Sequence, residues 1–254
     1  MSSVKQSAIW ELETRQLLLP KLDHAAAECE DFIAGNTETC RFAVTDGATE
    51  AFDARNWARR LAQNWVQAQS ALTAEQFREW VATEGRELHD SWNGLSLSWY
   101  SEEKARTGSF AALVGVELDL NTDSPSWNAI ALGDCCLLHC RDGTLLKSLP
   151  LSRSENFNCA PVLVASDASM HETSMKSLVI DSGNCHNQDV LLLLSDAIAC
   201  WFLERFEKGD LDPQELLKTK EDEELKRFFD EERLAGRMRN DDLAVLRIEL
   251  ISGE

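Results

Sequence analysis

The chain has 254 residues, of which 44% are hydrophobic and eight are tryptophan, so its composition supports a substantial core and excludes a disordered acidic tail. The formal net charge of −19 argues against binding to nucleic acid or to an anionic membrane surface. No apolar run approaches the roughly 20 residues that span a bilayer, and Met1–Gln6 lacks the apolar core of a signal peptide, so we expect a cytoplasmic protein.

The organisation of the chain points to one unit. It shows no internal repeat, no low-complexity linker and no shift in composition. We therefore predict a single domain over residues 1–254, although the length would also allow two small ones. The eight cysteines include no paired Cys-x-x-Cys zinc pattern. They are expected to be reduced and mostly buried.

The N-terminal part of the chain predicts two strands. A short strand covers Ala8–Glu11, and an irregular connection follows to Asp31. The next strand, Phe42–Thr45, ends on the dipeptide Asp46-Gly47.

Two amphipathic helices follow this second strand. Apolar residues spaced four apart define the buried face of the first helix: Trp57, Leu61 and Trp65. The second helix begins at Thr73, which has capping-box spacing to Gln76. Its expected buried stripe is Phe77, Trp80, Val81 and Leu88. The tryptophans are therefore read as core residues rather than as ligand contacts.

The middle of the chain changes to a strand period of two. Alternate residues share one face of a predicted strand: Phe110, Ala112, Val114, Val116 and Leu118. A second strand covers Trp127–Leu132, and a hairpin joins Cys136–Cys140 to Thr144–Leu149 through the turn Arg141-Asp142-Gly143. The segment Pro150–Met175 is rich in Ser, Asn and Asp and is predicted to be a long surface excursion.

The C-terminal part alternates strands and helices. After a strand over Val190–Leu194, a helix carries Trp201, Phe202 and Phe206. Asp212-Pro213 has the cap-and-proline pattern of a helix start. The next helix, which Gly236 stops, is expected to turn four residues inward: Leu225, Phe228, Phe229 and Leu234. The chain finishes on a strand over Leu243–Ile251. This order of elements is typical of an α+β protein rather than of repeated βαβ units.

Aspartates recur at the tips of four of these strands. Apolar runs end on Asp46, on Gly133-Asp134 and on Ser195-Asp196, and the last strand begins after Asp241-Asp242. Packing alone gives no reason for this placement, whereas hard cations such as Mg²⁺ and Mn²⁺ favour carboxylate, carbonyl and water ligands. Each dipeptide also has a simpler reading, since Asp-Gly is an ordinary turn and Asp196 could cap the following helix.

An ordered set of short motifs along the chain is more specific than any one of them. It consists of Glu30-Asp31, Asp46-Gly47, Thr107-Gly108-Ser109, Gly133-Asp134, Ser195-Asp196-Ala197 and Asp241-Asp242. In this order the chain resembles the metal-dependent protein Ser/Thr phosphatases of the 2C type (PPM-type), as a divergent member. The match runs from Glu28 to Ile251. It implies a four-layer αββα sandwich, in which two antiparallel β-sheets pack face to face and helices flank both outer sides.

The resemblance also implies a chemistry. Two Mn²⁺ or Mg²⁺ ions, with a more loosely held third, would activate a bridging water that attacks the phosphorus of phosphoserine or phosphothreonine in proteins. The phosphorylated protein would be the substrate, and a Ser/Thr kinase a partner. By position the resemblance makes Asp46 the bridging ligand and the Gly47 carbonyl a ligand of the second ion. Asp196 and Asp241 correspond to ligands of the first ion. Asp31 corresponds to the acid acting through metal-bound water, and Asp134 to a ligand of the third ion.

Departures from the family pattern leave an alternative open. The glycines usual after Asp-Gly are replaced by Ala48-Thr49-Glu50. In the family an arginine that binds the substrate phosphate often precedes the early acidic pair, but here only His24 and Lys21 lie nearby. Without that guanidinium, phosphate binding would rest mostly on the metal ions. The same fold with impaired turnover, acting as a binding or regulatory module, is the alternative. An aspartyl-phosphate phosphotransferase would need Asp-x-Asp, which Asp46-Gly47-Ala48 does not supply.

The Pro150–Met175 excursion is the expected specificity element. It follows the hairpin after Gly133-Asp134, where the family often carries a mobile flap. We therefore predict that it lies beside the metal site and influences substrate choice.

Overall fold

The computed structural model describes residues 10–68, 73–122, 124–157, 160–209 and 213–253, and it contains two antiparallel sheets. The first sheet has the order β1 (Trp10–Leu19), β11 (Leu243–Ser252), β10 (Val190–Leu194), β6 (Cys136–Arg141) and β7 (Thr144–Leu149). The second has the order β2 (Asp31–Asn36), β3 (Arg41–Gly47), β4 (Phe110–Asp119), β5 (Ser126–Leu132) and β9 (Val179–Asn184), with the short β8 (Val164–Ala165) also paired to β4. Every strand pair in them is antiparallel.

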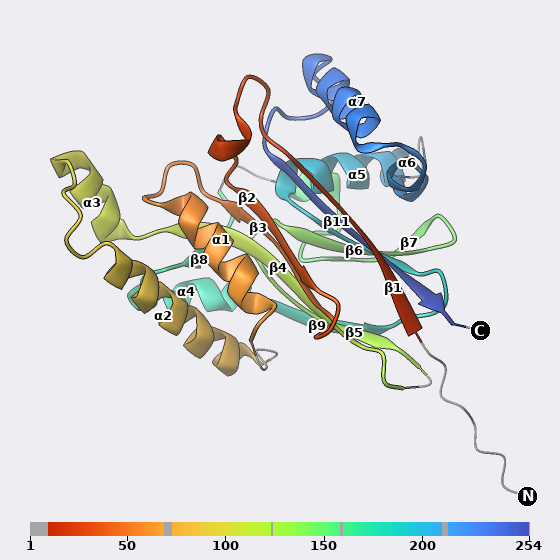
Figure 1. Ribbon diagram of the computed structural model, residues 1–254, viewed down its shortest axis with the longest axis horizontal. Helices are drawn as coiled ribbons and strands as arrows, with labels where there is room; N and C mark the ends of the chain where they lie inside the picture. The colour runs from red at the N-terminus through yellow and green to blue at the C-terminus, as the bar shows by residue number, and fades with distance from the viewer. Residues whose placement is uncertain (1–9, 69–72, 123, 158–159, 210–212, 254) are drawn as a thin grey trace, which may run out of the picture.

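Helices cover the outer face of each sheet, so the molecule has four layers (Figure 1). The second sheet is covered by α1 (Ala54–Trp65) and α2 (Ala74–Ser91), and the first by α5 (Asp196–Lys208), α6 (Pro213–Thr219) and α7 (Asp222–Leu234). One buried cluster lies between each sheet and its helices, and a third cluster, which includes Val114 and Leu246, fills the space between the two sheets. The predicted αββα sandwich is confirmed.

Local sequence explains how the helices on the second sheet form and dock. The apolar stripe of α1 places Trp57, Leu61 and Trp65 fully in the core, and Trp57 donates a hydrogen bond from Nε1 to the Val164 carbonyl at 2.9 Å. In α2 the Thr73 hydroxyl accepts from the Gln76 amide at 3.2 Å, which confirms the capping box. These tryptophans are core residues, as predicted.

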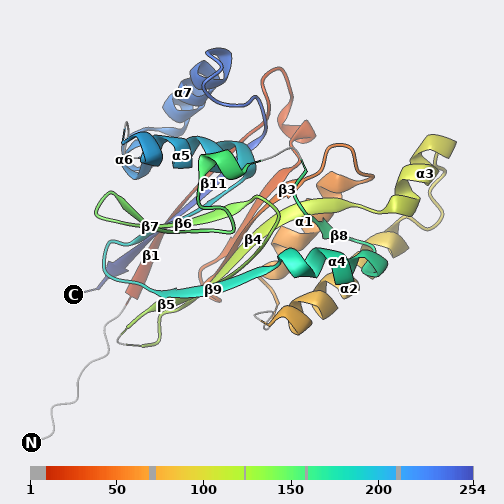
Figure 2. The ribbon, with the colours of Figure 1, turned by 180° about the vertical axis from the view of Figure 1, so that it is seen from behind.

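Several elements differ from the sequence prediction. β1 extends to Leu19 instead of ending at Glu11, and β2 and β9 have no predicted counterpart. α3 (Trp99–Thr107) was also missed, because it buries none of its residues and so shows no apolar stripe. It lies beyond α2 at one end of the molecule (Figures 1 and 2).

One predicted core residue of the C-terminal helices lies at the surface. Leu234 is 77% exposed, so its inward orientation was wrong. It lies nine residues after the buried Leu225, which is two and a half turns and therefore the opposite face of α7. The predicted cap Asp212 lies outside the described residues.

The segment Pro150–Met175 is more ordered than a surface excursion. It contains β8 and the short α4 (His171–Ser174), and Val164 and Ser166 are buried. The Ser166 hydroxyl accepts from the Ser109 amide at 2.9 Å and lies 2.9 Å from His89 Nε2. These bonds attach the segment to the residue that precedes β4 and to α2.

Two further expectations concern cysteines and membrane spans. Cys29, Cys135, Cys136 and Cys185 are buried free thiols, as predicted, and burial raises the pKa of Cys29 and Cys185 to about 12. Within the part of the chain that the structure describes, no helix combines the length and apolar character needed to cross a membrane.

Candidate metal centre

The acidic residues lie where the ends of the two sheets meet. In the second sheet Asp31 begins β2 and pairs in register with Asp46 near the end of β3, and Asp134 follows β5. In the first sheet Asp196 follows β10 as the first residue of α5, and Asp241 precedes β11. In an antiparallel sheet, the starts of some strands lie beside the ends of their neighbours at the same end of the sheet, which brings residues distant in sequence together.

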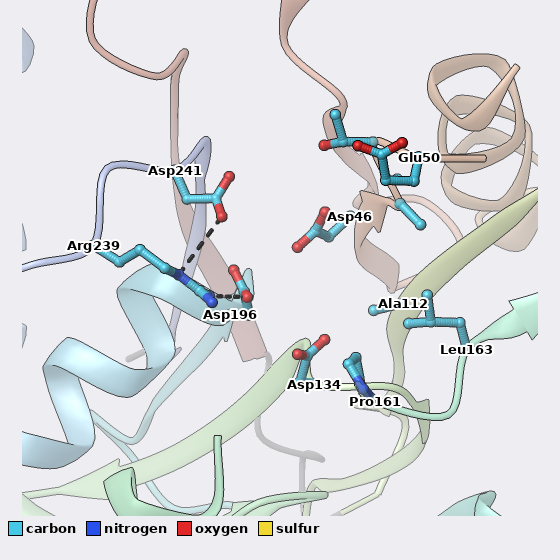
Figure 3. A pocket seen from close by; sticks show the side chains of 12 residues that line it. Asp46, Glu50, Ala112, Asp134, Pro161, Leu163, Asp196, Arg239 and Asp241 are labelled. Carbon is cyan, nitrogen blue, oxygen red and sulfur yellow. Dashed lines mark hydrogen bonds and ion pairs between the residues drawn. The ribbon is translucent and has the colours of Figure 1, made fainter. Parts of the chain in front are cut away.

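Three of these carboxylates form a compact cluster. Asp46, Asp134 and Asp196 each offer an oxygen, and the three oxygens all lie within 4.8 Å of one another. They line a cavity of about 320 Å³ together with Gly47 and Asp241. Figure 3 shows the four carboxylates pointing into the same space from different elements. Five of the six predicted site residues therefore meet at one cavity.

The sixth, Asp31, does not line this cavity, although its charge acts on Asp46. Its side chain is 1% exposed, and its Oδ2 is buried without a hydrogen-bond partner among the described residues. A buried carboxylate oxygen without a partner is unfavourable unless a cation or a water satisfies it.

Glycines allow the backbone to pass closely at two points of the site. A Cβ on Gly133, whose φ is +109°, would lie 2.5 Å from the Ala112 Cβ. A Cβ on Gly47 would lie 2.9 Å from the Ala54 carbonyl oxygen. The two glycines next to Asp46 and Asp134 therefore set the approach of β3 and β5 to their neighbours.

Crowding raises the pKa of the cluster carboxyls. For Asp46 the largest cause is burial, and the charges of Asp31, Asp196 and Asp134 add to it. Burial and then the charge of Asp196 raise the pKa of Asp134 to about 7. The pKa of Asp196 is also raised, chiefly by burial, although the guanidinium of Arg239 opposes this. The cluster holds more negative charge than it can stabilise alone.

Asp241 and Asp242 have different environments. Asp241 lines the cavity. Asp242 is 4% exposed and accepts hydrogen bonds from the backbone amides of Lys21 at 2.8 Å and Glu30 at 2.9 Å. Asp242 therefore anchors the connection between β1 and β2, and Asp241 is the one of the pair available to a ligand.

Arg239 is a site residue that sequence reasoning missed. Among the described residues it is the one cationic side chain that lines the acidic cavity. Its Nη2 contacts Asp196 Oδ2, and its Nε lies 3.6 Å from Asp241 Oδ2 (Figure 3). The available signal was its position two residues before Asp241, in a loop that must reach the site. Lys21 does not line the cavity but also pairs with Asp241, with Nζ 3.1 Å from Asp241 Oδ1.

The donor set fits a hard divalent cation. All the clustered side-chain donors are carboxylates, and no histidine or cysteine lines the cavity among the described residues. Oxygen-only donors favour Mg²⁺, Mn²⁺ or Ca²⁺ over softer metals.

The raised pKa values predict how stability depends on pH without metal. Between about pH 4 and 7 the folded protein binds more protons at these aspartates than the unfolded chain does, so the free energy of unfolding should fall as pH rises. Melting in chelator should therefore occur at a higher temperature near pH 5.5 than near pH 8, and Asp134→Asn should reduce the difference. A melting temperature that rises from pH 5.5 to 8 in chelator would contradict this.

Similar structures identify the architecture. No family model matches the chain, and no curated protein matches it in sequence. The catalytic domain of the serine/threonine protein phosphatase PstP, in complex with two manganese ions, superposes with a TM-score of 0.60 at 14% identity, over 96% of this chain and 100% of that one. The chain has the fold of the 2C-type phosphatases.

Other phosphatase structures show the same similarity. Stp1 from Staphylococcus aureus has a TM-score of 0.58 at 13% identity, with 100% of both chains covered. The photosystem II phosphatase PBCP has a TM-score of 0.58 at 15% identity, over 94% of this chain and 98% of that one. The 2C-type fold is therefore confirmed for nearly the whole chain, as the sequence landmarks predicted.

Proposed function

We propose that this chain, as a single domain over residues 1–254, is a metal-dependent hydrolase of phosphoserine and phosphothreonine in proteins. The observation that carries the proposal is the carboxylate cluster, whose three oxygens lie within 4.8 Å of one another. It is supported by the fold, which is shared with a phosphatase solved with two manganese ions.

The residues around the cavity have distinct proposed roles. Asp46 reaches the cluster from the second sheet and would be shared between two ions, with the Gly47 carbonyl as a ligand of one of them. Asp196 and Asp241 would hold the other ion from the first sheet. Asp134 would bind a third, weaker ion, and the unpartnered Oδ2 of Asp31 would accept a hydrogen bond from coordinated water.

Mn²⁺ or Mg²⁺ at this cluster would supply an activated water nucleophile and charge neutralisation at the phosphoryl group. The chain's own carboxylates orient that chemistry, since their backbone positions are fixed by strand ends on both sheets.

Arg239 is our candidate for the phosphate contact that the sequence lacks near Asp31. Its guanidinium is at the cavity, and its side chain is 48% exposed, so it can turn from the carboxylates toward a bound phosphate. A planar guanidinium with several donors suits bidentate binding of phosphate oxygens.

The direct test is hydrolysis of a small aryl phosphate and of phosphopeptides by the purified protein. We expect turnover only with Mn²⁺ or Mg²⁺, complete loss in chelator, and a rise in melting temperature when metal is added. Absence of both metal-dependent turnover and a metal-induced rise in melting temperature would refute the proposal.

The second candidate function is a binding or regulatory module with the same fold. The contact of Arg239 with Asp196 and its approach to Asp241 favour it, because a guanidinium there could replace one of the two ions and prevent turnover, while Asp46 and Asp134 still bind metal. A melting shift with metal but no turnover on any phosphopeptide would support this candidate.

The proposal includes a phosphoprotein substrate, a partner Ser/Thr kinase that would produce it, and a cytoplasmic location. The buried free thiols, such as Cys29 and Cys185, are compatible with a reducing compartment.

A further inference from the structure

An apolar cavity adjoins the acidic one. Its volume is about 310 Å³, and the side chains of Ala51, Phe52 and Phe110 contribute to its walls. It shares three lining residues with the acidic cavity: Ala48, Glu50 and Leu163. The two cavities therefore lie side by side with a common boundary, and carboxylates line one while apolar side chains line the other.

The walls of this apolar cavity are held in place by specific contacts. Phe52 packs edge-on against Trp92 with ring centroids 4.9 Å apart, and its carbonyl accepts a hydrogen bond from the Ser109 hydroxyl. Gly108, with φ +84°, lines the cavity where a Cβ would lie 2.9 Å from the Ser166 hydroxyl oxygen. A cavity fixed in this way can receive a side chain without paying for reorganisation.

The charges at the rim offset each other. Lys104 Nζ lies 3.6 Å from Glu50 Oε2 and 5.2 Å from the centroid of the Tyr100 ring. Lys104 and Glu50 are the two charged residues among those that line the apolar cavity. An uncharged apolar group is therefore the occupant that its chemistry favours.

We propose that this cavity binds an apolar side chain of the substrate, within two residues of the phosphorylated one. The inference rests on the proposed phosphatase function, because the phosphoryl group in the acidic cavity fixes where the peptide lies. An extended peptide advances about 3.3 Å per residue, so a neighbouring side chain can reach across the shared wall at Leu163. The substrates are phosphopeptides with a leucine-like residue at one such position.

The test compares phosphopeptides with glycine at the two positions before and the two positions after phosphothreonine. Leucine then replaces glycine at each of these four positions in turn. At one position, leucine should raise kcat/KM by about tenfold or more over glycine, the size of effect that an apolar pocket provides. If leucine changes kcat/KM by less than about twofold at every position while the aryl phosphate is still hydrolysed, the inference is overturned and the proposed function stands.

A filled-cavity variant tests the location. Thr107 is an exposed cavity residue, so Thr107→Trp should fold normally, occupy the mouth and remove the leucine preference. Arg106→Trp is the matched control, since Arg106 is exposed and does not line the cavity. Arg106→Trp should hydrolyse the aryl phosphate at the wild-type rate, and the melting temperature of Thr107→Trp should match that of Arg106→Trp. A leucine preference that survives Thr107→Trp would place its origin elsewhere.

A binding measurement separates this inference from the proposed function. Fluorescein-labelled peptides carrying a non-hydrolysable phosphonate should show the same leucine preference by anisotropy, even in a protein without turnover. Loss of turnover together with a retained preference would refute only the hydrolase assignment, and equal binding of all peptides would refute the cavity.

Discussion

Asp46→Asn should reduce metal-dependent turnover by about a thousandfold or more, because it removes a ligand proposed to be shared by both ions, and such ions supply several kcal/mol of transition-state stabilisation. The same change should raise the melting temperature of the metal-free protein. Asp46 is buried beside Asp31, Asp134 and Asp196, and their mutual repulsion and desolvation disfavour its charge. Measurements of kcat/KM with Mn²⁺, and of melting with and without metal, test both effects.

The control for this variant is Asp90→Asn, which removes a carboxylate at an exposed position of α2 that does not line the acidic cavity. It should leave turnover and the metal-induced melting shift unchanged. An Asp46→Asn protein that loses activity because its metal-free form is strongly destabilised would contradict the interpretation of Asp46 as a ligand and favour a structural role.

Arg239→Ala should strengthen metal binding and weaken substrate binding at the same time. In the absence of metal, the guanidinium bonds to Asp196 and lies near Asp241, so a cation has to displace it. Its removal should tighten Mn²⁺ binding by about tenfold to a hundredfold, the value of a hydrogen bond to a charged group. Titration calorimetry with Mn²⁺ measures this effect.

Arg239→Ala should weaken the binding of the substrate phosphate. KM for phosphopeptides should rise by about tenfold, and inhibition by inorganic phosphate should weaken in parallel. Arg237→Ala is the matched control, because Arg237 lies in the same loop but bonds to Glu232 and does not line the acidic cavity. Unchanged Mn²⁺ affinity in Arg239→Ala would refute competition, and unchanged KM would refute the phosphate contact.

The sequence placed the clustered aspartates better than it placed the edge strands of the sheets. Asp46 is near the end of a mostly buried strand, and Asp134 and Asp196 each follow one, so the end of the apolar run locates the carboxylate. The helices with one apolar face, such as α1, were equally clear. Both patterns arise from burial, which the sequence records directly.

Elements with little burial were missed for the same reason. β1 is an edge strand whose early residues are mostly exposed, so its pattern fades after Glu11, and β9 is likewise an edge strand without buried residues. The position of Arg239 two residues before Asp241 was its one signal, but its contact with Asp196, 43 positions earlier in the chain, depends on the loop conformation. No periodicity encodes such a contact.

The pairing of β1 with β11 affects when the site can assemble during synthesis. Leu19 pairs with Leu243, and β11 also lies against β10. Until the last strand leaves the ribosome, β1 and β10 both present open hydrogen-bonding edges, which are sites for mispairing and aggregation. At about 5–20 residues per second, the first strand waits for tens of seconds or less. A nascent chain therefore has no complete carboxylate set and no closed first sheet, so a holding chaperone has its longest opportunity to act on this part of the molecule.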